Sequence, residues 1–226
     1  TAHGYHLELL GTATNVSAAN TATTFLSTGN LVLGNAAGDA LTFAGGLTAT
    51  APAAVQAAGT VGTTHADIVL GTAPVTLTDN TSFNAGSGLI TLGGTVDGAY
   101  SLALNSTGVT TLGSAVGDGA ALTSITTNTG GTVVIKGGRI TTSGAQTYND
   151  DVLLDNAAAR ATVLNTTNAA VLLGAKLSNN TAAAEALTIN SGNGAVTFTG
   201  AVGDAVGTNN GPVGALAVNT TGATTF

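Results

Sequence analysis

The chain has 226 residues and a formal net charge of −7, and only 7% of its residues are charged, against about 25% in typical soluble proteins. Its basic residues are Lys136, Arg139, Arg160 and Lys176, too few for the phosphate-neutralising surface that a nucleic-acid partner requires. Apolar residues come only in short runs, which excludes a transmembrane segment, and the absence of cysteine excludes disulfides and thiolate metal sites.

The first residues contain the densest group of side chains that bind transition metals. His3, His6 and Glu8 lie close together in sequence, and imidazole and carboxylate groups are ligands of such metals. The alternative is an exposed terminal segment without a site. Because residue 1 is Thr, we expect a processed product or a fragment, and its start lacks the features of a signal peptide.

The segment 1–83 repeats less regularly than the rest of the chain. Gly38-Asp39 marks a turn, because Asp and Gly favour tight corners. The alternation of apolar and polar residues fails between residues 52 and 66, where we predict a protruding loop or a poorly formed coil. We therefore expect less regular coils over 1–83 and regular coils over 84–226, in one continuous array.

From residue 84 onward one motif recurs, in which Asn is followed by a turn of Thr, Ser or Gly and then by a short apolar strand. It is clearest from Asn84 to Leu92 and from Asn190 to Phe198. The asparagines that open the six copies are Asn84, Asn105, Asn128, Asn165, Asn190 and Asn219. We expect them to form a structural ladder at the corners of a coil, because stacked amides can hydrogen-bond whereas stacked like charges repel.

Two further short strands precede each motif, as in Val96-Asp97 and Leu102–Leu104. Each repeat unit thus has three strands with period-two alternation, bounded by Gly, Asn and Asp, and shows no helical period. Three short strands cannot bury their apolar side chains alone, but stacked units can. The sequence therefore predicts an all-β fold, a right-handed parallel β-helix (β-solenoid) with about three short strands per coil of 20–29 residues.

Alternation along the strands also predicts which side chains point inward. The inward positions expected are Leu102, Leu104, Leu122, Ile125, Val133, Ile135, Val152, Leu154, Leu187, Ile189, Val196, Phe198, Leu216 and Val218.

The step from Asn128 to Asn165 is longer than one coil, and we interpret it as one coil plus most of another. It contains Tyr148, which like Tyr100 is a candidate for an exposed aromatic platform or a corner cap. It also contains the best candidate calcium site, because Ca²⁺ prefers oxygen ligands. The residues of this candidate site are Asn149, Asp150, Asp151 and Asp155. Apart from calcium at this cluster we expect no cofactor, and the tandem Gly-Gly-x-Gly-x-Asp pattern of calcium-binding solenoids does not occur.

Several repeats are similar to those of a known class of protein. The stretches 142–150, 191–202 and 219–226 resemble the degenerate repeats of filamentous-haemagglutinin-like and autotransporter-passenger-like bacterial exoproteins. The resemblance covers 84–226 well and 1–83 loosely. It implies export to the cell surface or the extracellular space, a long β-helical shaft, and a role in adhesion, aggregation or matrix building.

These observations favour a structural segment of an exported surface or matrix fibre that is not an enzyme. No catalytic residues are assigned, because the chain lacks a Gly-x-Ser-x-Gly elbow and a Gly-Lys-Ser/Thr phosphate loop. The pattern reaches its last residue, Phe226, so we expect head-to-tail or lateral assembly with other copies, or contact with flanking coils. Cell-surface glycans or receptors are the other expected partners. The alternative is a glycan-binding or glycan-processing β-helix.

Overall fold

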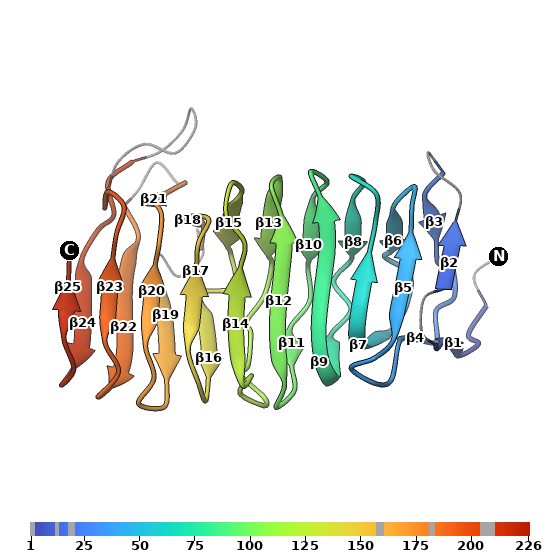
Figure 1. The fold of residues 1–226 in the computed structure, drawn as a ribbon, viewed down its shortest axis with the longest axis horizontal. Helices are drawn as coiled ribbons and strands as arrows, with labels where there is room; N and C mark the ends of the chain where they lie inside the picture. The colour runs from blue at the N-terminus through green and yellow to red at the C-terminus, as the bar shows by residue number, and fades with distance from the viewer. Residues whose placement is uncertain (1–2, 12–13, 18–20, 157–160, 181–183, 204–210) are drawn as a thin grey trace.

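The structure, a computed structural model, describes residues 3–11, 14–17, 21–156, 161–180, 184–203 and 211–226. These residues form strands, turns and bends, and no helix occurs among them. The described chain therefore has no helix that is long and apolar enough to cross a membrane. It winds as a right-handed solenoid, with its first and last coils at opposite ends of the long axis (Figure 1). The predicted fold class is confirmed.

Each full coil passes through three faces, which we name first, second and third in chain order. The first face contains β1 (Leu7–Leu9), β4 (Asn30–Leu33), the N-terminal parts of β7 (Ala54–Gly62) and β9 (Val75–Gly86), β11 (Val96–Asp97), β16 (Arg139–Thr142), β19 (Ala161–Thr166), β22 (Ala186–Gly192) and β24 (Leu216–Thr220). The second face contains β2 (Thr14–Ser17), β5 (Ala40–Phe43), the C-terminal parts of β7 and β9, β12 (Ser101–Ser106), β14 (Ser124–Thr127), β17 (Gln146–Tyr148), β20 (Val171–Leu173), β23 (Val196–Phe198) and β25 (Thr224–Thr225). The third face contains β3 (Thr23–Thr24), β6 (Leu47–Ala49), β8 (Ile68–Leu70), β10 (Ile90–Leu92), β13 (Val109–Leu112), β15 (Thr132–Ile135), β18 (Asp151–Leu154) and β21 (Leu177–Asn179).

The strands of neighbouring coils pair in parallel. The third face is an eight-stranded sheet, and the last four strands of the first face form a four-stranded sheet. The other strands form a thirteen-stranded sheet, because β7 and β9 are long enough to run through the first and second faces together. Single bridges from Val116 to Val96 and to Ile140 carry the first face across the gap between β11 and β16.

One column of inward side chains on the first face follows the stacking through the whole chain. Each member pairs with its counterpart in the next coil, and successive members lie 20 to 29 residues apart. We call these residues the aliphatic column: Leu7, Leu31, Val55, Val75, Val96, Val116, Ile140, Leu164, Ile189 and Val218. The two end members are partly buried and the inner ones are buried. Burying one such side chain contributes about 1.5–3 kcal/mol, so the column is a major source of stability.

The inward positions predicted from alternation agree with the structure. Those from Leu102 to Phe198 are all buried, and Leu216 and Val218 are partly buried against the same core. Because side chains point alternately to the two sides of a strand, the polar residues between them lie outside.

The protruding loop that was one of the two predictions for residues 52–66 is wrong, because most of this segment is strand β7 and belongs to a coil. It pairs with β4 and β5 of the previous coil and with β9 of the next. The register shifts between Ala57 and Gly59, and Gly59 has a φ of 70°. Over this stretch β9 has more residues than β7, because Ala57 pairs with Leu77 whereas Gly59 pairs with Thr81. The extra residues of β9 form an irregularity of the β-bulge kind, and β7 itself keeps its odd-numbered positions buried on both sides of the shift. The small side chains of Ala57, Ala58 and Gly59 hide this alternation from sequence reasoning.

The long step from Asn128 to Asn165 is one coil plus two faces of the next, as interpreted from the sequence. Thr126 pairs with Thr147, so Asn128 stacks on Asn149 one coil later. From Asn149 the chain crosses the third face as β18 and reaches Asn165 within β19 of the first face. The repeat motif therefore moves by one face across this step.

Candidate functional site

The six asparagines of the repeat stand in two stacks, not in the one corner ladder that the sequence predicted. Asn84, Asn105 and Asn128 come at the ends of strands on the second face. The other set, Asn165, Asn190 and Asn219, pairs on the first face. The reason is the shift of the motif by one face after Asn128, because the same Asn-led turn then forms a different corner.

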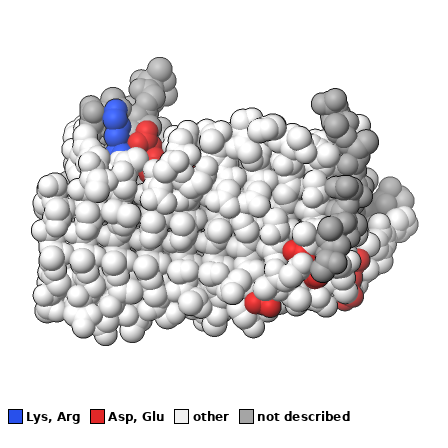
Figure 2. Space-filling view, in the orientation of Figure 1, with Lys and Arg blue, Asp and Glu red and all other residues white. Residues whose placement is uncertain are grey.

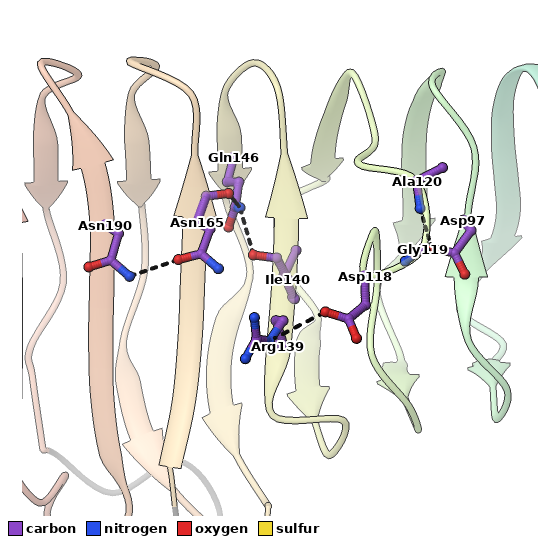
Figure 3. A network of polar contacts seen from close by, with 9 residues as sticks. All are labelled: Asp97, Asp118, Gly119, Ala120, Arg139, Ile140, Gln146, Asn165 and Asn190. Atoms are coloured by element: carbon purple, nitrogen blue, oxygen red, sulfur yellow. Dashed lines mark hydrogen bonds and ion pairs between the residues drawn. The ribbon is translucent and has the colours of Figure 1, made fainter.

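The stack on the first face is a continuous amide ladder. The Asn190 Nδ2 atom donates to Asn165 Oδ1 at 2.7 Å, as Figure 3 shows, and Asn219 Nδ2 donates to Asn190 Oδ1 at 2.7 Å. On the second face, Asn105 Nδ2 donates to Asn84 Oδ1 at 2.6 Å. Asn128 breaks that stack, since its Oδ1 accepts from the backbone N–H of Ser106 at 2.8 Å. Both stacks hold coils together and leave few amide groups free for a ligand.

The four residues of the candidate calcium site have separate partners. Asn149 Nδ2 donates to the Thr127 carbonyl oxygen at 2.7 Å. Asp151 Oδ1 accepts from the Lys176 backbone N–H at 3.0 Å, and Asp155 forms an ion pair with Lys136 at 3.2 Å. Each of these groups stabilises contact with a neighbouring coil. The side-chain oxygens of this cluster do not converge on one point, and calcium binding here stays a prediction.

Asp150, the fourth residue of the cluster, has a buried carboxyl group of which only one oxygen accepts a hydrogen bond. Its Oδ1 accepts from the Gly131 N–H at 2.8 Å, whereas its Oδ2 has no hydrogen-bond partner. Burial raises the pKa of Asp150, the hydrogen bonds from Gly131 and Thr127 oppose that rise, and the charge of Asp151 adds to it. A carboxyl group in this environment keeps its proton to a higher pH than an ordinary aspartate.

The N-terminal metal candidates are only partly brought together. His6 Nε2 lies 2.7 Å from Glu8 Oε1, and both side chains are about half exposed. The His3 ring stacks instead on Tyr5, with ring centroids 6.5 Å apart. Within the residues that the structure describes, no group of three or more His, Cys, Asp or Glu side chains is placed to hold a metal ion. Transition-metal binding at His3, His6 and Glu8 stays a prediction.

A polar network inside the core was not predicted from the sequence. Tyr148 is fully buried, not an exposed platform, and its hydroxyl donates to Gln146 Oε1 at 2.9 Å. Gln146 Nε2 donates to the carbonyl oxygens of Ile140 at 3.2 Å and Asn165 at 2.8 Å (Figure 3). Burial raises the pKa of the Tyr148 hydroxyl, which keeps it a hydrogen-bond donor. The network satisfies carbonyl groups at the corner between the first and second faces.

The sequence contained a signal for this network. Residues two apart on a strand point to the same side, so Gln146 and Tyr148 share one side of β17. Thr147 between them is more exposed, and Gln146 pairs with Ile125 below and Val171 above. Tyr100, the other aromatic candidate, is partly exposed at 36%.

The acidic turns near the middle of the chain join neighbouring coils. Asp97 Oδ1 accepts from the N–H groups of Gly119 and Ala120 at 2.8 and 3.0 Å, and Asp118 forms an ion pair with Arg139 at 3.5 Å (Figure 3). Gly117 before Asp118 has a φ of 70°, which favours glycine. These contacts stabilise the turns at the corners of the coils.

The charges visible in Figure 2 gather in two places, and the surface between them is uncharged. A shallow groove lies on the second face in the first half of the chain, beside Asp79, whose Oδ2 accepts from the N–H of the lining residue Ala37 at 3.0 Å. Its lining includes Thr60, Asn80, Ser82, Ser101 and Ala103. Hydroxyl and amide groups surround it, and Ser101 Oγ donates to Asn80 Oδ1 at 2.9 Å. Such a lining could hydrogen-bond an uncharged, hydroxyl-rich ligand.

Together, the parallel coils, the aliphatic column and the amide ladders define a β-solenoid repeat protein. Comparison of the chain with protein-family models, with curated proteins and with solved structures finds no match.

Proposed function

We propose that this chain is a structural segment of an exported bacterial surface or matrix fibre, with an adhesin-like role in attachment, aggregation or filament assembly. The observation that carries the proposal is the aliphatic column, which continues from Leu7 to Val218 with one residue per coil. A rise of about 4.8 Å per coil makes such a stack a rod with length proportional to its number of coils. Length and stiffness are properties of a shaft.

The surface chemistry supports a shaft as well. Outward columns consist mainly of Thr, Ser, Asn, Ala and Gly, and the few Asp residues in turns bind backbone N–H groups. Like residues can stack in such columns without electrostatic repulsion, so charge does not oppose the stacking of further coils. The proposal assigns no catalytic role to the chain.

The resemblance of 142–150, 191–202 and 219–226 to haemagglutinin-like repeats supports export and adhesion. On this proposal the protein lies outside the cell or on its surface. Its partners are other copies, flanking coils, and glycans or receptors on a neighbouring cell.

Two measurements test this proposal. Antibodies against the folded chain should label intact cells of the source organism, and external protease should remove that label. Beads coated with the chain should attach to those cells more than beads coated with the heat-unfolded chain. Label that appears only after permeabilisation, or equal attachment of both kinds of bead, would overturn the proposal.

The second candidate function is binding or processing of a glycan, and the groove on the second face favours it. Incubation with neutral cell-surface polysaccharides would separate the two, with bound polymer and new reducing ends as the readouts. The variant Ala103→Tyr fills the groove, and Ala217→Tyr places the same side chain on the exposed first face as a control. Binding lost only in Ala103→Tyr would favour the glycan function.

A further inference from the structure

Three side chains with complementary chemistry stand above one another where strands of the third face end. Lys136 directly follows the last residue of β15, Asp155 that of β18 and Asn180 that of β21. Their backbone N–H groups donate to the coil below, from Lys136 to Leu112 O, from Asp155 to Ile135 O and from Asn180 to Leu154 O, at 2.8 to 2.9 Å. Three successive coils thus hold an amine, a carboxyl group and a primary amide in one column.

The carboxyl group contacts both of its neighbours through one atom. Lys136 Nζ lies 3.2 Å from Asp155 Oδ2, and Asn180 Nδ2 donates to the same oxygen at 3.1 Å. The Asp155 side chain is only 16% exposed, so the packing around it holds this oxygen in place. The Lys136 amine and the Asn180 amide thus share a single proton acceptor, Asp155 Oδ2.

We propose that Lys136 and Asn180 form an intramolecular amide crosslink, with Asp155 as the general acid–base group. The Lys136 ammonium gives a proton to Asp155, and the neutral Nζ attacks Cγ of Asn180. The Nζ–Cγ bond forms, the Cγ–Nδ2 bond breaks, and Asp155 returns its proton to the departing nitrogen. The products are a secondary amide and one ammonia, which leaves with the second Nζ proton. No oxidant, metal or cofactor takes part.

The fold supplies what this reaction needs. Lys136 Nζ and Asn180 Nδ2 share one acceptor oxygen, so the attack needs only the Lys136 side chain to move from Asp155 Oδ2 onto Asn180 Cγ. Holding two reactants on one scaffold converts a slow bimolecular step into an intramolecular one, with effective concentrations that can reach about 10⁵ M or more when they are well oriented. The amine becomes nucleophilic only when neutral, and the adjacent carboxylate is the base that takes its proton. Two coils separate the partners by about 10 Å at 4.8 Å per coil, a distance that extended Lys and Asn side chains joined end to end can span.

The crosslink would fix three coils covalently in a chain that has no cysteine. It goes beyond the proposed fibre function and does not depend on it, because a chain of any function could carry it. In a shaft under tension, it would stop the coils around β15, β18 and β21 from separating.

Intact mass spectrometry of the full chain tests the proposal. After incubation at neutral and mildly alkaline pH, the mass should fall by one ammonia, and digestion should yield a peptide pair joined between Lys136 and Asn180. Lys136→Arg keeps the positive charge beside Asp155 but should abolish the loss, as should Asn180→Ala. Asp155→Asn should greatly reduce it. Lys176→Arg, a matched change elsewhere, should leave it intact.

Three results would overturn the proposal. The first is an unchanged mass at both pH values. The second is an ammonia loss that persists in Lys136→Arg, which would indicate a cyclised asparagine such as one at Asn193-Gly194. The third is a loss of one water that joins Lys136 to Asp155.

Discussion

Asn190 donates through Nδ2 to the side-chain oxygen of Asn165 at 2.7 Å and accepts from Asn219 at the same distance. Each amide thus acts as a donor to the coil before it and as an acceptor for the coil after it. Stacked amides of this kind add side-chain hydrogen bonds to those between strands. The ladder joins β19, β22 and β24 along the outer surface of the first face.

Removing the middle amide should destabilise the C-terminal coils. Asn190→Ala loses two side-chain hydrogen bonds, each worth about 0.5–1.5 kcal/mol, so we expect the free energy of unfolding to fall by about 1–3 kcal/mol. Chemical denaturation measures this change. Asn193→Ala, three residues later at an exposed position of the same turn, is the control and should change the free energy by less than about 0.5 kcal/mol. Equal effects would contradict the ladder.

Close contact between coils makes some glycines irreplaceable. A Cβ atom on Gly137 would overlap the backbone of Ser114 and Ala115 in the coil below. Relieving the overlap requires the two coils to move apart, so Gly137→Ala should cost on the order of 3 kcal/mol in unfolding free energy. Gly38→Ala meets no atom within 4 Å and should be nearly neutral. Thermal unfolding of both variants decides the matter, and a stable Gly137→Ala protein would show that these coils are not in contact.

The buried network should behave as one unit. Tyr148→Phe removes one hydrogen bond and should cost about 0.5–1.5 kcal/mol of unfolding free energy. Gln146→Leu should cost more, because it leaves the Tyr148 hydroxyl and the carbonyl groups of Ile140 and Asn165 without their partner. The double variant should cost less than the sum of the two, which a double-mutant cycle measures. Strict additivity would mean that the two side chains do not interact.

The raised pKa of Asp150 leads us to predict that the stability of the chain depends on pH. Because burial raises its pKa in the folded chain, the folded state keeps a proton that the unfolded state releases as pH rises past about 4, the ordinary range of aspartate. The free energy of unfolding should therefore fall as pH rises through this window, until the folded carboxyl also ionises.

The variant Asp150→Asn should remove this contribution. It should be more stable than the natural chain at neutral pH, and the difference should vanish below the ordinary range of aspartate. Denaturation at a series of pH values measures it, with Asp79→Asn, a more exposed carboxylate, as the control for losing one negative charge. A difference that does not change with pH would show that Asp150 titrates alike in both states.

Sequence reasoning found the stacked architecture because alternation and corner residues repeat locally. It also gave the inward side chains of regular strands such as β12, where Leu102 and Leu104 alternate with polar neighbours. It failed at β7, where Ala57, Ala58 and Gly59 give no contrast between inward and outward positions, and it could not tell which corner an Asn-led turn forms. That choice depends on how many residues each face uses, as the step between Asn128 and Asn165 illustrates.

The side-chain contacts of the candidate sites were harder to predict. Lys136, Asp155 and Asn180 are far apart in sequence and meet only because consecutive coils end their third-face strands at the same position. Gln146 and Tyr148 lie in a short polar stretch whose inward side is set by pairing with β14 and β20. Coil register, which the sequence does not state, decides both.

A designed cysteine pair tests the stacked register most directly, since the chain has no cysteine of its own. Thr91 and Thr111 pair across β10 and β13 and point outward on the third face. Parallel neighbours about 4.8 Å apart are within disulfide range. The double variant Thr91→Cys/Thr111→Cys should therefore form an intramolecular disulfide on mild oxidation. Thr91→Cys/Thr126→Cys places the second cysteine on another face and should stay reduced. A disulfide only in the second pair would contradict the solenoid.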